Sequence, residues 1–202
     1  MSAYSRAYFG TFPTDIVASI NAAVEVLQGR PAPAPYSIKD RKEALLMVAH
    51  FVGDLHQPLH VGAIYLDDAG KVIDPDRPPG EDAHTIEENF ATRGGNSIRI
   101  FGADLHTLWD HVPPAWGSQA TDGILAAAKA VRATPGAAGA LAATWATETV
   151  TLSPTVFAGL EFGPRVAGKW SATASDPVAY KAALRRSRAH RSPRQALGWL
   201  SC

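Results

Sequence analysis

Residues 50–60 read HFVGDLHQPLH, a run in which three histidines and one aspartate are interspersed with apolar side chains. Apolar residues upstream of this run recur at helical spacing, which predicts a helix that begins at an N-cap at Ser37 and continues into the run. Pro58 disfavours helical geometry in the residue before it, so this helix is expected to end near Gln57. The last histidine of the run, His60, therefore belongs to the turn that follows.

Two pairs of residues repeat the same spacing. His50 and Asp54 lie four residues apart, as do His106 and Asp110. Residues at this spacing share one face of a helix, so both side chains of a pair can converge on one ion. At about 100° per residue, His60 is rotated well away from the first pair, and we expect it to serve a different ion.

Histidine and aspartate are concentrated in two tracts. Five of the seven histidines lie within 50–60 and 106–111, and the only cysteine is the last residue, Cys202. Imidazole and carboxylate are ligands that zinc accepts alongside thiolate, whereas calcium and magnesium prefer oxygen. One His-x-x-x-Asp pair is more often a surface ion pair than a metal site. Two such pairs and a histidine in a turn favour a metal site, and zinc is the metal that these donors predict.

The rest of the chain is expected to be mostly helical. Apolar spacing predicts a helix over 14–28, and a cap at Asp104 with prolines at 113–114 predicts a short one over 105–111. Alanine-rich segments predict further helices over 121–134, 137–152 and 177–184. The segment 62–95 is rich in Asp, Pro and Gly, which predicts a long loop near the metal site. A turn at 94–96 and a strand over 97–101 indicate one short β-hairpin. The expected fold is therefore all-α, with a single domain over 1–184 and a basic C-terminal tail over 185–202.

Composition and charge limit the classes of function. The chain has 202 residues, of which 46% are hydrophobic, enough for a sizeable core. Basic and acidic residues balance at 19 each, so a polyanion would have to be bound at a local site rather than by a general field. No run of 18 apolar residues is present, which excludes an ordinary transmembrane helix. The first 30 residues carry no recognisable signal peptide.

Several motifs, in the same order, resemble the S1/P1 nuclease family. The run at 50–60 resembles the signature of that family, and GGN at 94–96, LHTLWD at 105–110 and WATET at 145–149 follow. The resemblance extends from about residue 8 to about residue 184. It implies a phospholipase C-like, mainly helical fold and a zinc-dependent endonuclease that cleaves single-stranded DNA or RNA to 5′-nucleotides. It also implies 3′-nucleotidase activity in some members, and a secreted or periplasmic protein.

The resemblance implies a role for His60 and for each residue of the two pairs. His60, His106 and Asp110 would hold one of the three zinc ions of the family. His50 would bind a second zinc, and Asp54 would bridge the second and the third and so act in catalysis. The implied reaction is hydrolysis of a phosphodiester by a metal-activated hydroxide.

The chain departs from the family pattern at its N-terminus. Family members use an N-terminal tryptophan, a histidine shortly after it, and a further Asp and His as zinc ligands. Residues 1–49 contain neither Trp nor His, so four ligands have no counterpart and we expect one complete zinc site. The simplest expectation is that an N-terminal segment with its signal peptide is missing. Asn96 is the candidate for substrate binding. Two alternatives stay open, a zinc-binding protein without catalysis and a phospholipase C-like phosphodiesterase.

Overall fold

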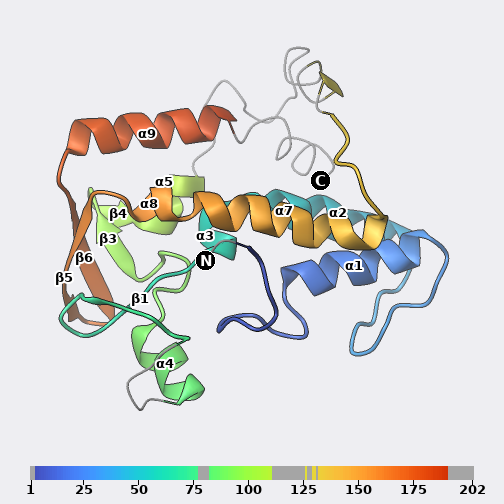
Figure 1. Ribbon diagram of the computed structural model, residues 1–202, viewed down its shortest axis with the longest axis horizontal. Helices are drawn as coiled ribbons and strands as arrows, with labels where there is room; N and C mark the ends of the chain where they lie inside the picture. Colours follow the sequence, from blue (N-terminus) through green and yellow to red (C-terminus); the bar gives the residue numbers. More distant parts are fainter. Residues whose placement is uncertain (1–2, 77–81, 111–125, 127–128, 131, 191–202) are drawn as a thin grey trace.

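A computed structural model describes residues 3–76, 82–110, 126, 129–130 and 132–190. In this part the chain is mainly helical, with a few short strands, as predicted (Figure 1). We call the packed helices α1 (Ile16–Leu27), α2 (Arg41–Leu55) and α7 (Ala138–Leu152) the helical half. The sheet half contains a four-stranded sheet and lies at the other end of the molecule. None of the helices in the described ranges is long and apolar enough to cross a membrane.

The helix α2 begins at Asp40, three residues later than the predicted cap at Ser37. Asp40 Oδ1 accepts a hydrogen bond from Glu43 N at 2.9 Å, and the Glu43 carboxylate accepts one from Lys39 N. These reciprocal contacts resemble a capping box and satisfy N–H groups at the start of the helix, which explains why the prediction of Ser37 was wrong. The helix ends at Leu55, close to the predicted end before Pro58.

The helical half is held by a core in which small residues permit close packing. Ala142 and Ala146 are fully buried, lie one turn apart on α7, and share a core with Val17, Ile20 and Leu55. Alanine at the contact lets helices approach closely, because interaxial distance depends on the side chains between them. The predicted helices at 14–28 and 137–152 are therefore confirmed as α1 and α7.

The sheet of the other half has the strand order β4-β3-β6-β5. Its strands are β3 (Ile98–Ile100), β4 (Ala103–Asp104), β5 (Leu160–Val166) and β6 (Lys169–Ala174). The hairpin of β3 and β4 is the one predicted around 97–101, whereas the hairpin of β5 and β6 was not predicted. The parallel pairing of β3 with β6 places Ile98 opposite Trp170. Trp170 is fully buried, and its Nε1 donates to Asp67 O at 2.7 Å.

Three helices pack with this sheet around one hydrophobic core: α5 (Leu105–Asp110), α8 (Pro154–Phe157) and α9 (Pro177–His190). Trp109 of α5 is 4% exposed, and Tyr180 of α9 donates its hydroxyl to Val156 O of α8 at 2.7 Å. The helices predicted at 105–111 and 177–184 correspond to α5 and α9. The helix predicted at 121–134 lies largely outside the described residues.

The segment 62–95 is more regular than the predicted long loop. It contains β1 (Tyr65–Leu66), β2 (Val72–Ile73) and the helix α4 (Ala83–Phe90). Asp82 Oδ1 accepts a hydrogen bond from Thr85 N at 2.7 Å, which caps α4. Ile86 is 1% exposed and packs with Tyr65 and Ala91 in a small core. The prediction of a loop was therefore wrong for α4, because a cap and one buried side chain stabilise a short helix there.

Asp104 of β4 forms ion pairs with basic residues of two other strands, Arg99 of β3 and Lys169 of β6. Its Oδ1 accepts a hydrogen bond from Lys169 Nζ at 2.8 Å, and Arg99 Nε lies 3.3 Å from the same oxygen. The hydrogen bond from Lys169 lowers the pKa of the Asp104 carboxyl below its ordinary value. Because the folded pKa is depressed, the contribution to stability is present above the ordinary pKa and is lost as the pH falls through the folded pKa.

We expect Asp104→Asn to lower the free energy of unfolding by about 0.5–1 kcal/mol at neutral pH, as for an exposed ion pair. The difference from the wild type should vanish in acid, below the depressed pKa. Urea denaturation at both pH values measures it. Asp68→Asn is the control, because Asp68 is 82% exposed and lies 3.8 Å from Arg165. An Asp104→Asn deficit that persists unchanged in acid would contradict the electrostatic explanation.

Candidate metal centre

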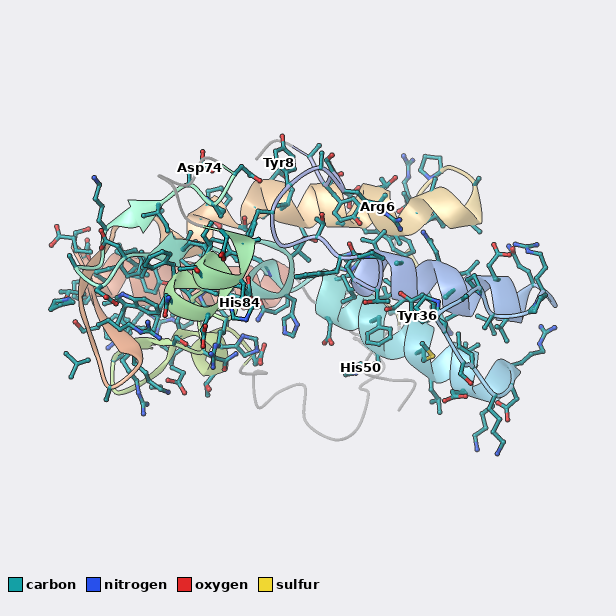
Figure 2. All side chains as sticks on the ribbon, turned by 90° about the horizontal axis from the view of Figure 1, so that it is seen from below. Arg6, Tyr8, Tyr36, His50, Asp74 and His84 are labelled. Atoms are coloured by element: carbon teal, nitrogen blue, oxygen red, sulfur yellow. The ribbon has the colours of Figure 1, made fainter. Side chains whose placement is uncertain are left out.

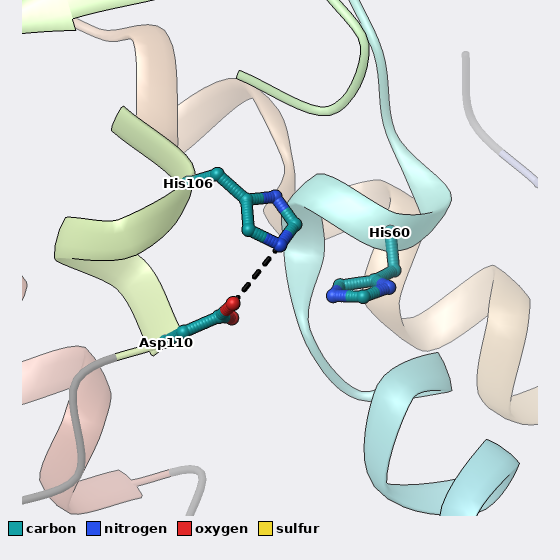
Figure 3. A group of neighbouring side chains, drawn as sticks. All are labelled: His60, His106 and Asp110. Atoms are coloured by element: carbon teal, nitrogen blue, oxygen red, sulfur yellow. Dashed lines mark ion pairs between the residues drawn. The ribbon is translucent and has the colours of Figure 1, made fainter. Parts of the chain in front are cut away.

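Three of the predicted ligands converge on one point (Figure 3). One ligand atom from each of His60, His106 and Asp110 lies within 4.8 Å of the other two. His60 comes from α3 (Pro58–Val61), whereas His106 and Asp110 come from successive turns of α5. The centroids of the two imidazole rings are 4.9 Å apart. We call this group the three-residue cluster; two nitrogens and one oxygen form a donor set that zinc accepts.

The short helix α3 directs three consecutive side chains to three different places. Leu59 is 3% exposed and belongs to the core of the sheet half, whereas Val61 packs against the core of the helical half. His60, between them, points toward α5 (Figure 3). Pro58 occupies the first turn, where its missing N–H costs nothing, and Gln57 Oε1 accepts a hydrogen bond from Leu59 N at 2.5 Å. A helix of this length depends on such contacts rather than on its own propensity.

Both nitrogens of the His106 ring have an assigned partner. Nδ1 donates to Gly94 O at 2.7 Å, and Nε2 lies 2.9 Å from Asp110 Oδ2. The hydrogen bond with Asp110 raises the pKa of His106, and the contact with Gly94 acts in the same direction. Because the carbonyl of Gly94 holds the Nδ1 proton, Nε2 is the nitrogen that can bind a metal. A metal ion would take the place of the proton shared with Asp110.

Gly94 has to be glycine for this contact to form. Its φ is +59°, and a Cβ at this position would lie 2.8 Å from Leu59 O. The missing side chain lets the turn at 92–98 approach α3 closely while its carbonyl reaches His106. The turn and both cluster helices are therefore in direct contact.

The electrostatics of His60 and Asp110 favour the protonation states that a metal requires. Desolvation by the surrounding protein lowers the pKa of His60, although the carboxylates of Asp54 and Asp110 oppose that shift. Burial alone would raise the pKa of Asp110, but hydrogen bonds from His106 and Gln57 outweigh it and lower the pKa. A neutral imidazole at His60 and an ionised carboxylate at Asp110 are thus both favoured.

His50 and Asp54 form a pair of their own on α2. His50 Nε2 lies 3.2 Å from Asp54 Oδ2, and the side chains are 62% and 22% exposed. Within the described residues, no third His, Cys, Asp or Glu completes a metal-binding group with them. The charge of Asp54 opposes the lowering of the His60 pKa and adds to the rise of the His106 pKa, so this carboxylate lies within electrostatic range of the cluster. The roles of His50 and Asp54 as zinc ligands, and of Asp54 in catalysis, stay predictions.

Two other polar residues lie outside the cluster. Asn96 is exposed, and its Nδ2 donates to Arg93 O at 3.0 Å, which stabilises the turn; its role in substrate binding stays a prediction. His84 lies on α4 (Figure 2), is 85% exposed and pairs with Glu88 at 3.5 Å. This i, i+4 pair also joins an imidazole to a carboxylate, but it is more exposed than the pair of His106 and Asp110, and it provides a natural control.

A cavity of about 220 Å³ opens beside His60 and Gly94. Aromatic side chains contribute much of its lining, and two charged residues complete it; they are Tyr4, Tyr8, Phe9, Phe12, Tyr65, Glu87 and Arg93. Arg93 is exposed and forms no ion pair with another described residue. Sequence reasoning did not find this cavity, because the spacing of the aromatic residues between positions 4 and 12 does not show that the fold brings His60, Glu87 and Arg93 beside them.

Two residues that orient the cluster were also missed as functional residues. Gln57 and Gly94 were recognised only as parts of sequence motifs. For Gly94, the glycine pair before Asn96 indicates a turn, but not that its carbonyl binds a histidine. Gln57 lies directly before Pro58, and the residue before a proline at the first helical position is typically the N-cap of the helix that follows. That signal could have identified Gln57 as the N-cap of α3, but not as the partner of Asp110.

Comparisons with known proteins agree with the motifs. A family model described as S1/P1 Nuclease matches residues 10–158, a range that includes the three-residue cluster. Endonuclease 2 of Arabidopsis thaliana is 36% identical over 90 residues, which are 45% of this chain and 23% of that protein. The matched region therefore spans less than a quarter of that relative. No solved structure gives a significant match to the chain.

Proposed function

Because the chain belongs to the S1/P1 nuclease family, we propose that it is a zinc-dependent nuclease that hydrolyses phosphodiester bonds in single-stranded DNA or RNA to 5′-nucleotides. One observation carries the proposal, the convergence of His60, His106 and Asp110 within 4.8 Å. Similarity to an endonuclease supports the class of reaction. Release of 3′-phosphate from nucleotides, and secretion or export to the periplasm, belong to the same proposal.

The residues of the cluster fit one zinc ion. Three protein ligands with one open position are typical of catalytic zinc. The Nδ1 contact with Gly94 fixes the ring of His106, and Gln57 holds one oxygen of Asp110 at 3.0 Å. When bound, zinc supplies Lewis-acid activation of water and of the phosphoryl group. The chain itself contributes the orientation of the ligands and, on the side of His60, access for a substrate.

The cavity beside the cluster supports a single-stranded substrate. Proteins bind single strands by stacking bases on aromatic rings and by contacting phosphates with basic groups. The cavity presents both kinds of group, the rings between positions 4 and 12 and the guanidinium of Arg93. A cavity of about 220 Å³ with aromatic lining would suit a base taken out of the stack, which a single strand offers more readily than a duplex. Since the chain has no net charge, such local contacts would have to recruit the nucleic acid.

A second candidate is a zinc-binding protein without catalysis. It is favoured by the His50/Asp54 pair, for which no third ligand is found among the described residues. Catalysis in two-metal sites relies on ions about 3.5–4 Å apart. A chain that binds only the ion of the three-residue cluster would lack this arrangement.

Zinc titration of the chelator-stripped chain tests the proposal. The nuclease proposal predicts hydrolysis of a labelled single-stranded oligonucleotide that is lost on chelation and restored by zinc, with at least one tightly bound zinc per chain. A duplex of the same sequence should be cleaved more slowly. Binding of one zinc without hydrolysis would favour the second candidate, and hydrolysis of phosphatidylcholine alone would favour a phospholipase. A chain that binds no zinc would refute both zinc-based functions.

A further inference from the structure

Gln57 connects the two helices that supply the cluster. Its side chain is buried, with an exposed fraction of 5%. Oε1 accepts a hydrogen bond from Leu59 N at the start of α3, and Nε2 donates to Asp110 Oδ1 at 3.0 Å on α5. One amide group therefore links the helix that carries His60 to the helix that carries Asp110.

The two oxygens of Asp110 have different partners. Oδ1 accepts the hydrogen bond from Gln57, whereas Oδ2 lies 2.9 Å from His106 Nε2 and faces the cluster. With Oδ1 held in this way, the carboxylate presents a single oxygen to an ion at the centre of the cluster. The rotation that would offer both oxygens to the ion would break the hydrogen bond to Gln57.

The contact is strong enough to restrain the carboxylate. A hydrogen bond to an ionised acceptor is stronger than one between neutral groups. Both ends of the buried amide are engaged, and breaking either contact would leave a buried polar atom without a partner, which is costly. The Leu59 N–H lies at the start of α3, and the Leu59 side chain is buried in the core of the sheet half. The amide of Gln57 is therefore fixed at this end.

We propose that Gln57 is a positioning residue that holds Asp110 in single-oxygen coordination and thereby sets the zinc affinity of the three-residue cluster. The inference rests on the zinc site of the proposed function. It assigns to one side chain two separable tasks, capping of α3 and orientation of Asp110. Groups that orient metal ligands typically change metal affinity about 10–100-fold when removed.

Gln57→Asn separates the two tasks. Asparagine is a favourable N-cap residue, but its side chain is one methylene shorter and cannot reach Asp110 from the same backbone position. We expect the metal-free variant to stay folded, with an unfolding temperature lowered only by the loss of the hydrogen bond to Asp110, and to bind Co²⁺ about 10–100-fold more weakly. Gln57→Ser, a second N-cap without reach, should behave in the same way and serves if the first variant folds poorly.

The visible spectrum of bound Co²⁺ gives a readout that a loss of folding would not produce. Four-coordinate cobalt absorbs more strongly than five- or six-coordinate cobalt. At saturating metal, we expect Gln57→Asn to show weaker absorption than the wild type, because a released Asp110 can offer both oxygens. Gln28→Asn is the matched control, since Gln28 is an exposed glutamine at the end of α1, and it should change neither affinity nor spectrum.

Two results would overturn the inference in distinguishable ways. Wild-type affinity and spectrum in Gln57→Asn would leave the zinc site intact and reduce Gln57 to a helix cap. A wild-type chain that binds no Co²⁺ would instead remove the zinc site of the proposed function, and the inference with it.

Discussion

Replacement of His106 by alanine is expected to weaken zinc binding by at least about 100-fold, because it removes a proposed direct ligand rather than a group that orients one. The substitution takes away one of the three donors of the three-residue cluster and the partner of Asp110 Oδ2. It also leaves the carbonyl of Gly94 without its donor. Competition with a chromophoric chelator measures the affinity, and any zinc-dependent hydrolysis should be lost together with the metal.

The matched control is His84→Ala. His84 and Glu88 have the same i, i+4 spacing, at 3.5 Å, but the histidine is 85% exposed and lies on α4. We expect this variant to bind zinc as the wild type does. Zinc binding at wild-type affinity in His106→Ala would show that the three-residue cluster is not the site of the tightly bound ion.

Replacement of Trp170 by alanine is expected to lower the free energy of unfolding by about 3–5 kcal/mol, the usual cost of removing a large buried aromatic side chain. Trp170 is fully buried in the core of the sheet half, and its Nε1 donates to Asp67 O at 2.7 Å. The guanidinium of Arg165 lies 4.9 Å from the ring centroid. The substitution therefore removes a large apolar surface, a hydrogen bond and a cation–π contact together. Denaturant titration of the metal-free chain measures the loss.

Val166→Ala is the control for Trp170. Val166 lies in the same hairpin but is 70% exposed, so its truncation should change stability by no more than about 0.5 kcal/mol. Trp170→Phe retains much of the buried surface and removes the donor to Asp67, so it should fall between the two. A Trp170→Ala chain as stable as the wild type would mean that the β5–β6 hairpin does not anchor the sheet half.

The helical elements were predictable because their physical causes are local. Apolar residues recur at helical spacing in α1, alanine is frequent in α7, and Gly29 follows α1 with a φ of +82°. The β5–β6 hairpin lacks such a signal. Gly163 and Pro164 interrupt β5 at a register shift, and both residue types indicate a loop when read in isolation. The strand forms because β6 lies beside it and Trp170 is buried, which is a property of the packed chain.

The candidate site was predictable as a set of residues but not as an arrangement. Spacing on a helix is sufficient to pair His106 with Asp110, and Pro58 is sufficient to separate His60 from the helix before it. Contact between α3 and α5 depends on how the cores pack. The amide of Gln57 and the carbonyl of Gly94 act across that contact, so neither role can be inferred from spacing along the chain.

The place of His60 between Leu59 and Val61 affects how the fold fluctuates. Its two neighbours are anchored in different halves of the molecule, whereas Leu105 and Trp109 of α5 pack in the core of the sheet half. Any relative displacement of the halves would therefore pull His60 away from His106 and Asp110. A bound ion would link the two halves. Local opening of either half would first have to release the ion, so its free energy would rise by the binding free energy of the metal. The concentration of free metal would then determine how often the two halves open independently of each other.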